Sequence, residues 1–571
     1  MKRDVWLILA LTVVFAVTGG APYFHPDGLV DEAVTALDHR GRTGFFWYPG
    51  FIIYLNATVY GALRGLSRLF GGPGDWDALG DALDALPGLS FNTPGHLVTV
   101  AFAFLGALAA YLVVRRLTGS RGPALFAAGL LAVSLLWVRN AHYVTPDVPL
   151  ASLCLLTVYA TLVAVGAGAP FARRHLVLLG VCLGLVAATK YNGAVVALPV
   201  GLAMLWSYRG RYPRMIGDGL LLGAVAIAVF AALNPYLFID WKTAHEQFLF
   251  LANEFSVGKL GFEIESGWRH HLADSLYHGY GPVPMLLAAI GIIRVLAGRD
   301  IRARDKAVLL AFPVVFFLLM GHENVSFARH IVPILPFVAV LSALGGAWVF
   351  ETARRCVPER ALPWVLLALV LLALVPGARQ SARHNALLAA GDTRQDLVQL
   401  LRSASNLPTV NVYAGYYGKR DVRKGRLPFR HFVMSSTTFK EKRDPIRGVF
   451  HHPLDIIVLD SFSHDRLLRP DGSRTEAPAP GEFEDLRVLQ ISPFRIDKTQ
   501  VPLTSESIYS PSLPDMRYRR RAGPFIEIYC RAGPVADGLR AALERSGVPG
   551  AWRPGREGYY FNRAGGPIEL R

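Results

Sequence analysis

The feature that most constrains this chain is a series of long apolar runs joined by short loops rich in arginine. Eleven runs are long enough to cross, or nearly cross, a lipid bilayer. They cover residues 5–20, 97–114, 123–138, 148–168, 176–189, 193–208, 217–234, 282–297, 307–321, 330–350 and 363–377. Hydrophobic residues make up 52% of the 571 residues and charged residues 18%, below the ~25% of an ordinary soluble domain. The sequence therefore predicts a mainly α-helical polytopic membrane protein with about 11 transmembrane helices.

Basic residues mark every second loop between these runs. The loops concerned contain Arg115, Arg116 and Arg121; Arg173 and Arg174; Arg209, Arg211 and Arg214; Arg294, Arg299, Arg302, Arg304 and Lys306; and Arg354 and Arg355. Cytoplasmic loops carry such an excess of arginine and lysine. The pattern predicts a cytoplasmic N-terminus and an extracytoplasmic C-terminal region. It also accounts for much of the net charge of +16, so nucleic acid is not expected as a partner.

The remaining sequence predicts two parts. Residues 1–377 form a transmembrane domain with a first external loop at 21–96 and a second long external loop at 235–281, which begins and ends at prolines. Residues 51–63 are predicted to form an amphipathic helix on the outer leaflet. Residues 378–571 are more polar and predict a soluble extracytoplasmic α/β domain. In it, Asp392 can cap a helix over 393–403, and five short β-branched or aromatic runs predict strands at 410–417, 431–436, 455–460, 486–491 and 525–530.

The N-terminal run is predicted to be a retained signal-anchor, because no cleavage-site pattern follows it. The four cysteines form no CxxC pair and predict no disulfide framework. No Walker loop, GxSxG motif or glycine-rich nucleotide motif is present, so a soluble nucleotide is not indicated as the energy source. His270, His271 and His278 lack zinc-site spacing and are expected to face solvent.

Several acidic residues directly follow the first apolar run. Acidic groups at membrane depth are functional candidates, because lipid would remove their solvation. Asp27 is the first candidate, as a base or electrostatic partner for an acceptor; the alternative is a helix cap. Asp31 and Glu32 come next, but they can also simply complement a helix dipole.

Other polar residues lie at the predicted outer ends of later runs. The short loop RNAHYVTPDVP contains His142, Tyr143 and Asp147; Asp147 can be a second acidic site or a helix cap. Lys190 ends one run and can either bind an anion or extend along the lipid surface. Arg329 and His330 begin another run. Lysine and arginine suit phosphate binding, so an anionic lipid headgroup is expected near Lys190 and Arg329.

These segments together resemble a known family. They read FHPDGLVDEAVTAL, FFWYPGFIIYLNATVYG, RNAHYVTPDVPL, TKYNGAVVALP, LNPYLFIDW, FARHIVPILPF and GDTRQDLVQLL. Over about residues 25–400 the chain resembles the membrane-embedded GT-C glycosyltransferases. Within them it is similar to the bacterial protein-O-mannosyltransferase-like branch (glycosyltransferase family 39), which is akin to the lipid A aminoarabinose transferases. Residues 405–571 show no such likeness.

The resemblance implies an enzyme that moves a sugar from a polyprenyl-phosphate donor to an acceptor by an inverting displacement. The acceptor can be a protein, a lipid or a glycan. The family's first-loop base maps to Asp27, although Gly28 stands where relatives carry Glu and the acidic pair follows at Asp31 and Glu32. The second-loop acid maps to Asp147. Lys190 and Arg329 are the candidates for donor phosphate binding, with His142, Tyr143 and His330 beside them.

The resemblance also implies a location in the cell envelope, in a bacterial inner membrane. No metal ligands are assigned and no cofactor is certain; a divalent cation is left open. The alternative function is a polytopic transporter or lipid flippase, which would show charges at mid-membrane and broken helices. The enzyme reading requires Asp27, Asp147, Lys190 and Arg329 to lie close together.

Overall fold

The computed structural model describes most of the chain. The described residues are 2–20, 25, 27–86, 89–168, 170–257, 266–323, 325–404, 406–414, 425, 429–434, 455–464, 486–501 and 516–554. They form two compact units, and the division between them falls inside the long helix α19 (Leu362–Ala389), after Asn385. We call the part up to Asn385 the helical unit and the part from Ala386 onward the sheet unit.

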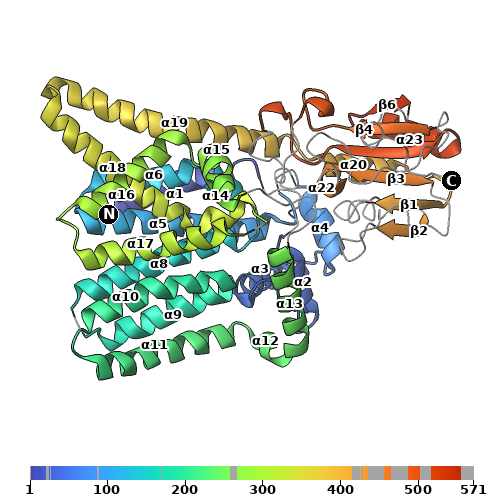
Figure 1. Ribbon diagram of the computed structural model, residues 1–571. Coiled ribbons are helices and arrows are strands. Elements are labelled where there is room, and N and C mark those ends of the chain that lie inside the picture. The colour runs from blue at the N-terminus through green and yellow to red at the C-terminus, as the bar shows by residue number, and fades with distance from the viewer. Residues whose placement is uncertain are drawn as a thin grey trace. The chain divides into compact units, whose positions relative to one another are not determined.

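All eleven predicted apolar runs are helical (Figure 1). The corresponding helices are α1 (Lys2–Val17), α5 (Thr93–Thr118), α6 (Arg121–Val133), α7 (Leu135–His142), α8 (Asp147–Gly166), α9 (Arg173–Thr189), η1 (Tyr191–Val196), α10 (Ala197–Ser207), α11 (Tyr212–Ala232), α16 (Pro282–Ala297), α17 (Ala303–Gly321), η3 (Ala328–Ile334), α18 (Leu335–Cys356) and α19. Among the residues that the structure describes, five helices are long and apolar enough to cross a membrane, or up to seven if each bent pair is one span. The predicted number of eleven spans is therefore not confirmed, because the other helices are shorter or more polar.

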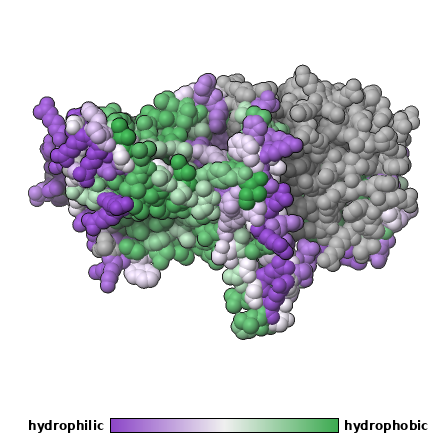
Figure 2. Space-filling view, turned by 90° about the horizontal axis from the view of Figure 1, so that it is seen from below, coloured by the Kyte–Doolittle hydropathy of each residue, from purple (hydrophilic) through white to green (hydrophobic). Residues whose placement is uncertain are grey.

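The surface of the helical unit suits a lipid environment. Figure 2 shows a broad hydrophobic area over its helices, with hydrophilic residues gathered at the edges of that area. Large apolar side chains such as Leu220 and Ile227 on α11 and Trp364 on α19 are exposed. A monomeric soluble protein rarely exposes a continuous apolar surface of this kind. The helical unit is therefore the membrane part of a multi-pass membrane protein.

Two helix pairs of the helical unit are sharply bent. The α6–α7 pair bends by 57° at Ser134, whose hydroxyl donates to the Gly279 carbonyl (3.1 Å). The segment Gly267–Gly279 and α16 meet at 118°. The first bend turns α7 away from the direction of α6. The polar residues at the end of α7 therefore lie among other helices in the interior.

Small residues bring two apolar helices close together. A Cβ atom added to Gly291 on α16 would lie 1.9 Å from the carbonyl oxygen of Leu341 on α18, and one added to Gly345 would lie 2.0 Å from that of Leu287. Only glycine allows backbones to approach so closely, which is a common device where helices pack in membranes. These contacts fix α16 against α18, which continues from the η3 turn.

Three helices follow α1, and the first of them carries the candidate acids Asp31 and Glu32. They are α2 (Val30–Asp38), α3 (Gly50–Leu69) and α4 (Trp76–Asp84). Leu29, Ala33 and Ala36 pack against Ile52, Ile53 and Ala57. The predicted helix at 51–63 is thus present as part of α3, and one of its faces is buried on α2.

The long loop 235–281 is itself mostly helical in its described part. The prolines mark the expected boundaries, because α12 (Pro235–Ile239) begins at Pro235 and α16 begins at Pro282. Between them lie α13 (Trp241–Val257), α14 (Gly267–Arg269), the π-helical turn η2 (His270–Leu276) and α15 (Tyr277–Gly279). His270 and His271 are buried, so the expectation that they face solvent was wrong; only His278 is exposed. The π-turn packs against η3, which periodicity does not predict.

The sheet unit contains a six-stranded mixed sheet. Its strands are β1 (Val410–Ala414), β2 (Phe429–Met434), β3 (Ile456–Asp460), β4 (Leu486–Ile491), β5 (Ile526–Arg531) and β6 (Ala551–Pro554). Their order is β2-β1-β3-β5-β4-β6, with β1, β2 and β3 parallel and the other pairings antiparallel. The five predicted strands are confirmed with small shifts, and β6 was not predicted. The α/β class predicted for this region is therefore correct.

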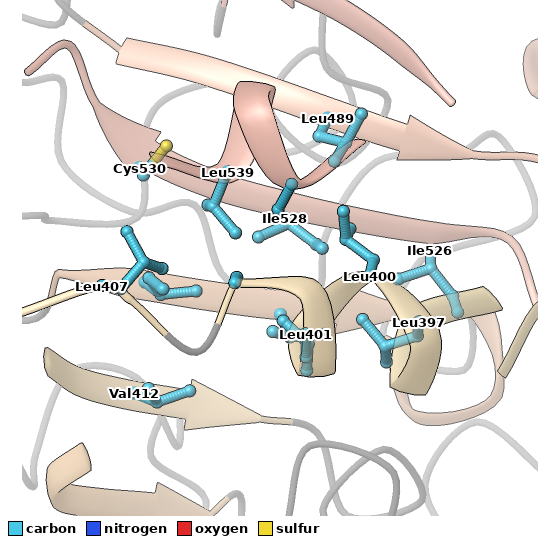
Figure 3. Close-up of a cluster of buried hydrophobic side chains, with 14 of the residues drawn as sticks. Leu397, Leu400, Leu401, Leu407, Val412, Leu489, Ile526, Ile528, Cys530 and Leu539 are labelled. Carbon is cyan, nitrogen blue, oxygen red and sulfur yellow. The ribbon is translucent and has the colours of Figure 1, made fainter. Parts of the chain in front are cut away.

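Two helices cover one face of this sheet. They are α20 (Thr393–Ser403), which Asp392 caps as predicted and where Gln395 completes a capping box, and α23 (Pro534–Ser546). Figure 3 shows Leu400 of α20 next to Ile528 on the sheet, and Leu397 and Leu401 of α20 belong to the same buried cluster as Ile528 and Leu539 of α23. All five side chains are almost fully buried, and such burial contributes about 1.5–3 kcal/mol for each large aliphatic side chain.

Candidate functional site

Asp27 lies in the segment between α1 and α2, which backbone hydrogen bonds hold in place. The Asp27 amide donates to His25 Nδ1 (3.1 Å), and the Leu29 amide donates to the Val144 carbonyl (2.9 Å). The second bond attaches this segment to the loop before α8. Leu29 is the N-cap of α2 and no side chain caps this end, so the Asp27 carboxylate does not act as the helix cap.

The Asp27 carboxylate instead faces Arg329. Arg329 Nη1 donates to Asp27 Oδ2 across 2.5 Å, although 302 residues separate the two in sequence. Arg329 lies in η3, just before α18, and its guanidinium carbon is 5.4 Å from the centroid of the Phe327 ring. The Asp27 side chain is 20% exposed and the Arg329 side chain is 8% exposed, so this ion pair is largely shielded from water.

Asp147 forms a second ion pair. It is the first residue of α8, and that helix end has no side-chain cap, so Asp147 is not a helix cap either. Its Oδ1 accepts a hydrogen bond from Lys190 Nζ (2.8 Å), and its side chain is 1% exposed. Lys190 directly follows α9. Since it is bonded to a buried acid, this lysine does not simply extend along the lipid surface.

The second oxygen of Asp147 has no such bond. Among the residues that the structure describes, no hydrogen-bond partner approaches Asp147 Oδ2, which is buried. An unsatisfied buried oxygen costs free energy and calls for an explanation such as a catalytic role or an unmatched ligand group. This oxygen is the least satisfied acidic atom of the site.

The two ion pairs belong to one electrostatic neighbourhood. Burial lowers the pKa of His25 to about 3, and the charges that act on it include Asp27, Arg329 and Asp147. The pKa of Tyr48 is raised chiefly by burial, and the same three charges act on it. We call Asp27, Arg329, Asp147 and Lys190 the four-charge cluster. The expected proximity of these residues is confirmed, whereas their catalytic and binding roles stay predictions.

Tyr48 is a site residue that the sequence did not single out. Its ring centroid is 5.6 Å from Lys190 Nζ, and the charge of Arg329 acts on its hydroxyl. A cation near an aromatic face is stabilised by the ring's quadrupole. Tyr48 is therefore a neighbour of both cations of the cluster. The available signal was the aromatic run FFWYPG, which follows the acidic segment just before α3.

His330 lies next to the four-charge cluster. Its Nδ1 is 3.2 Å from Glu323 Oε2, and its charge acts on Asp147. His330 also acts on the buried His271 of the π-turn. A polar layer thus continues from the cluster toward the segment before α16, and His271 was not predicted to be part of it.

His142 and Tyr143, the other predicted donor-binding residues, have mainly structural contacts. His142 Nδ1 is 2.7 Å from the Val138 carbonyl and Nε2 is 3.0 Å from the Thr18 carbonyl, so both nitrogens face the backbone. The Tyr143 ring lies 4.3 Å from that of His25. Tyr143 therefore supports the segment that holds Asp27, while His142 lies deeper, between the rings of His96 and His384.

The remaining candidate acids lie on α2. Asp31 is exposed and Glu32 is partly buried. Burial and the neighbouring Asp31 raise the pKa of Glu32 to about 7. Asp31 acts on Tyr60 of α3, whereas the carboxylate bonded to Arg329 belongs to Asp27. The geometry favours Asp27 over both as the acid beside the cations.

The site residues do not fit a metal ion as they are arranged. Within the described ranges, no group of three or more histidine, cysteine, aspartate or glutamate side chains could hold one. The cluster carboxylates each bond to a cation of the chain itself. No step below therefore goes through a metal.

Comparisons with known proteins bear on the fold and the family. Residues 90–238 match the family described as dolichyl-phosphate-mannose-protein mannosyltransferase, which is less than half of the chain. The search of curated proteins found no match.

Solved structures match over much more of the chain. The apo oligosaccharyltransferase of Archaeoglobus fulgidus is 12% identical with a TM-score of 0.55, over 81% of this chain and 70% of that one. The same organism's AglB in complex with an inhibitory peptide and a dolichol-phosphate gives 12% and 0.50, over 76% and 64%. This chain thus spans about two thirds of the archaeal enzyme. ArnT from Cupriavidus metallidurans bound to undecaprenyl phosphate is 15% identical with a TM-score of 0.48, over 80% and 92%.

The archaeal matches show the fold of this chain. The chain has the fold of the GT-C glycosyltransferases, as the resemblance implied. The family match covers residues 90–238, which include the helices from α5 through α11. That segment supplies Asp147 and Lys190, one acid and one cation of the cluster.

Proposed function

We propose that this protein is a glycosyltransferase that moves a sugar from a polyprenyl-phosphate donor to an acceptor hydroxyl at the membrane surface. The observation that carries the proposal is the meeting of two acids and two cations from four distant segments in one shielded cluster. Catalysis of this transfer needs a base for the acceptor and positive charge for the leaving phosphate. The cluster supplies both within a GT-C fold.

In the proposed reaction Asp27 accepts the proton of the acceptor hydroxyl. The acceptor oxygen then forms a bond to the anomeric carbon, and the bond from that carbon to the phosphate oxygen breaks. The bonding electrons leave with the phosphate, and the configuration at the sugar carbon inverts. A positioned base typically contributes about 10²–10⁴-fold in rate.

Arg329 and Lys190 would stabilise the charge that develops on the leaving phosphate. Cations that are already in position when charge develops need no reorganisation, which makes them effective in a water-poor site. The guanidinium can bind two phosphate oxygens at once, and the ammonium acts as a point charge. Asp147 holds Lys190 in place, and its second oxygen is the candidate contact for a polar group of the sugar.

The arrangement of helix ends supports a site on the extracytoplasmic face of a bacterial inner membrane. α8 begins with Asp147 and its far end leads to the arginines that open α9; α9 in turn ends next to Lys190. Acids and arginine-rich loops thus lie at opposite ends of the same helices. By the positive-inside rule the arginine ends are cytoplasmic.

The donor and acceptor classes are drawn from relatives. The family match names dolichyl-phosphate-mannose, and similar structures are described with dolichol-phosphate or undecaprenyl phosphate. The shared chemistry is a polyprenyl phosphate. The acceptor is proposed only as a hydroxyl-bearing protein, lipid or glycan.

A polytopic transporter or lipid flippase is the second candidate, and one observation favours it. The two bent helix pairs are a feature of transporters as well. The ion pairs, however, lie at helix ends: Asp147 begins α8, Lys190 follows α9 and Arg329 precedes α18. Transporters place their substrate sites near mid-membrane, so the enzyme is the better-supported proposal.

The test is to incubate the purified protein, in lipid nanodiscs, with a panel of polyprenyl-phosphate sugars and a mixture of membrane lipids, peptides and glycans. The expected result is the release of free polyprenyl phosphate together with a sugar-labelled acceptor. If intact donor only moves between the leaflets of vesicles, the flippase is supported instead. If no donor is consumed under any acceptor mixture, the proposal is wrong.

A further inference from the structure

Both cations that would bind the donor phosphate are already bonded to a carboxylate. Arg329 is paired with Asp27 and Lys190 with Asp147. Charge attraction is several times stronger in such shielded surroundings than in water. A phosphate that approaches these cations must therefore compete with the carboxylates.

The two ion pairs differ in how easily they can open. The Asp147 side chain is 1% exposed and belongs to the first turn of a helix, whereas the Asp27 side chain is 20% exposed and belongs to a connecting segment. A buried carboxylate that loses its partner without reaching water is strongly destabilised. Asp27 can regain water or a hydroxyl partner when it leaves its cation, so its pair is the one that can open.

Arg329 has further contacts that would keep it in place when Asp27 leaves. The Phe327 ring centroid lies 5.4 Å from its guanidinium carbon, and the buried Tyr48 hydroxyl lies close enough for the Arg329 charge to act on it. The guanidinium offers five N–H donors in a fixed fork. Exchange of a carboxylate for a phosphate therefore needs no movement of the arginine.

The exchange has a chemical consequence for the base. A carboxylate beside a guanidinium is stabilised in its ionised form and is a weaker base than a free one. Removing the guanidinium restores the tendency of the carboxylate to accept a proton. A base that is paired until the donor arrives cannot act on an acceptor, or on water, before the donor is bound.

We propose that the donor phosphate displaces Asp27 from Arg329 and so releases the base only when the donor is in place. This inference rests on the proposed function and adds a fixed order of events to it. Arg329 changes partner from the carboxylate to the phosphate. The freed Asp27 then turns to the acceptor hydroxyl, while Lys190 and Asp147 stay paired.

The test measures the binding of farnesyl monophosphate, which carries no sugar, to the full-length protein. Asp27→Asn and Asp27→Ala remove the competing charge, so both are expected to bind the phosphate about tenfold more tightly, as the loss of one charge-assisted hydrogen bond predicts. Farnesol, which lacks the phosphate, should bind equally to all variants. The matched control is Asp240→Asn, because Asp240 forms an Asp–Arg pair with Arg42 (2.7 Å) elsewhere in the helical unit, and its phosphate affinity should not change.

A second measurement uses the unaltered protein, in case the Asp27 variants do not fold. Farnesyl monophosphate should increase several-fold the labelling of Asp27 by a water-soluble carbodiimide, and farnesol should not. Unchanged or weaker phosphate binding in folded Asp27 variants, or unchanged labelling, would overturn the inference. If Arg329→Ala and Lys190→Ala both bind the phosphate as well as the unaltered protein, the phosphate assignment in the proposed function fails instead.

Discussion

Two buried acids of the sheet unit, Glu527 and Asp392, differ from Asp147 of the helical unit in how their carboxylate oxygens are satisfied. In the sheet unit, Glu527 on β5 is fully buried, and its oxygens accept hydrogen bonds from Gln490 and from Tyr529. Asp392 likewise uses both oxygens to bind Arg394. In the helical unit, one oxygen of Asp147 bonds to Lys190 and the other has no partner within the described part of the chain.

This difference separates buried charge that stabilises a fold from buried charge that is available for chemistry. Fully satisfied polar networks make a structure rigid and specific. An acid with one unbonded oxygen beside a second ion pair carries a free-energy cost at that oxygen. Such costs are typical of functional sites, where strained or unsatisfied groups become part of the mechanism.

The sharpest test of this comparison is Asp27→Asn in the helical unit. The amide cannot accept the acceptor proton, so transfer from a polyprenyl-phosphate sugar should fall by about 10²–10⁴-fold, measured as release of polyprenyl phosphate. Asp240→Asn is the control and should keep its activity. Full activity in Asp27→Asn would move the role of base to Asp31 or Glu32, whose asparagine and glutamine variants should then be inactive.

The sheet unit should respond to loss of packing in its core. Leu400→Ala removes a fully buried side chain from the α20 face (Figure 3) and should lower the free energy of unfolding of this unit by about 2–5 kcal/mol. The measurement is denaturant unfolding followed by hydrogen exchange of the β5 amides. Farnesyl monophosphate binding should be unchanged, and a loss of that binding would show that the two units are not independent.

A charge-removing change in the sheet unit should cost stability and leave phosphate binding alone. Glu527→Gln disturbs two buried hydrogen bonds, and we expect a loss of about 1–3 kcal/mol in the same unfolding experiment. Asp147→Asn is the matched change in the helical unit. If both variants keep phosphate binding and transfer, the distinction between the two kinds of buried charge is wrong.

The smallest expected effect is a pH dependence from Glu32. Its pKa rises from an ordinary value of 4.5 to about 7 in the folded chain, so the folded state holds this proton more tightly than the unfolded state. Its contribution to stability is then fully present below pH 4.5 and is lost as the pH rises through 7. Glu32→Gln should remove that loss and unfold at a higher temperature than the unaltered protein at pH 8, with little difference at pH 4. An unchanged pH profile of unfolding would mean that Glu32 is better solvated than its burial indicates.

Sequence patterns predicted the local elements well because those elements depend on neighbouring residues. The eleven apolar runs are all helical, α20 begins at the predicted Asp392 cap, and helices α12 and α16 begin at the expected prolines. The number of transmembrane spans was harder to predict, because hydropathy does not distinguish a short buried helix from one that crosses the bilayer. The strand β6 was missed, since its short sequence lacks the alternation typical of a strand.

The amino-acid sequence by itself determined the helical membrane unit, the α/β class of the rest, and nine candidate site residues, among them the four of the cluster. Only the tertiary structure decided which of them form ion pairs. Arg329 bonds to Asp27 across 302 residues, and Lys190 bonds to Asp147. Tyr48 lies near both cations. Hydrophobic periodicity is a local property of the chain. Which acid pairs with which cation depends instead on how distant helices pack and on which charges they bury together.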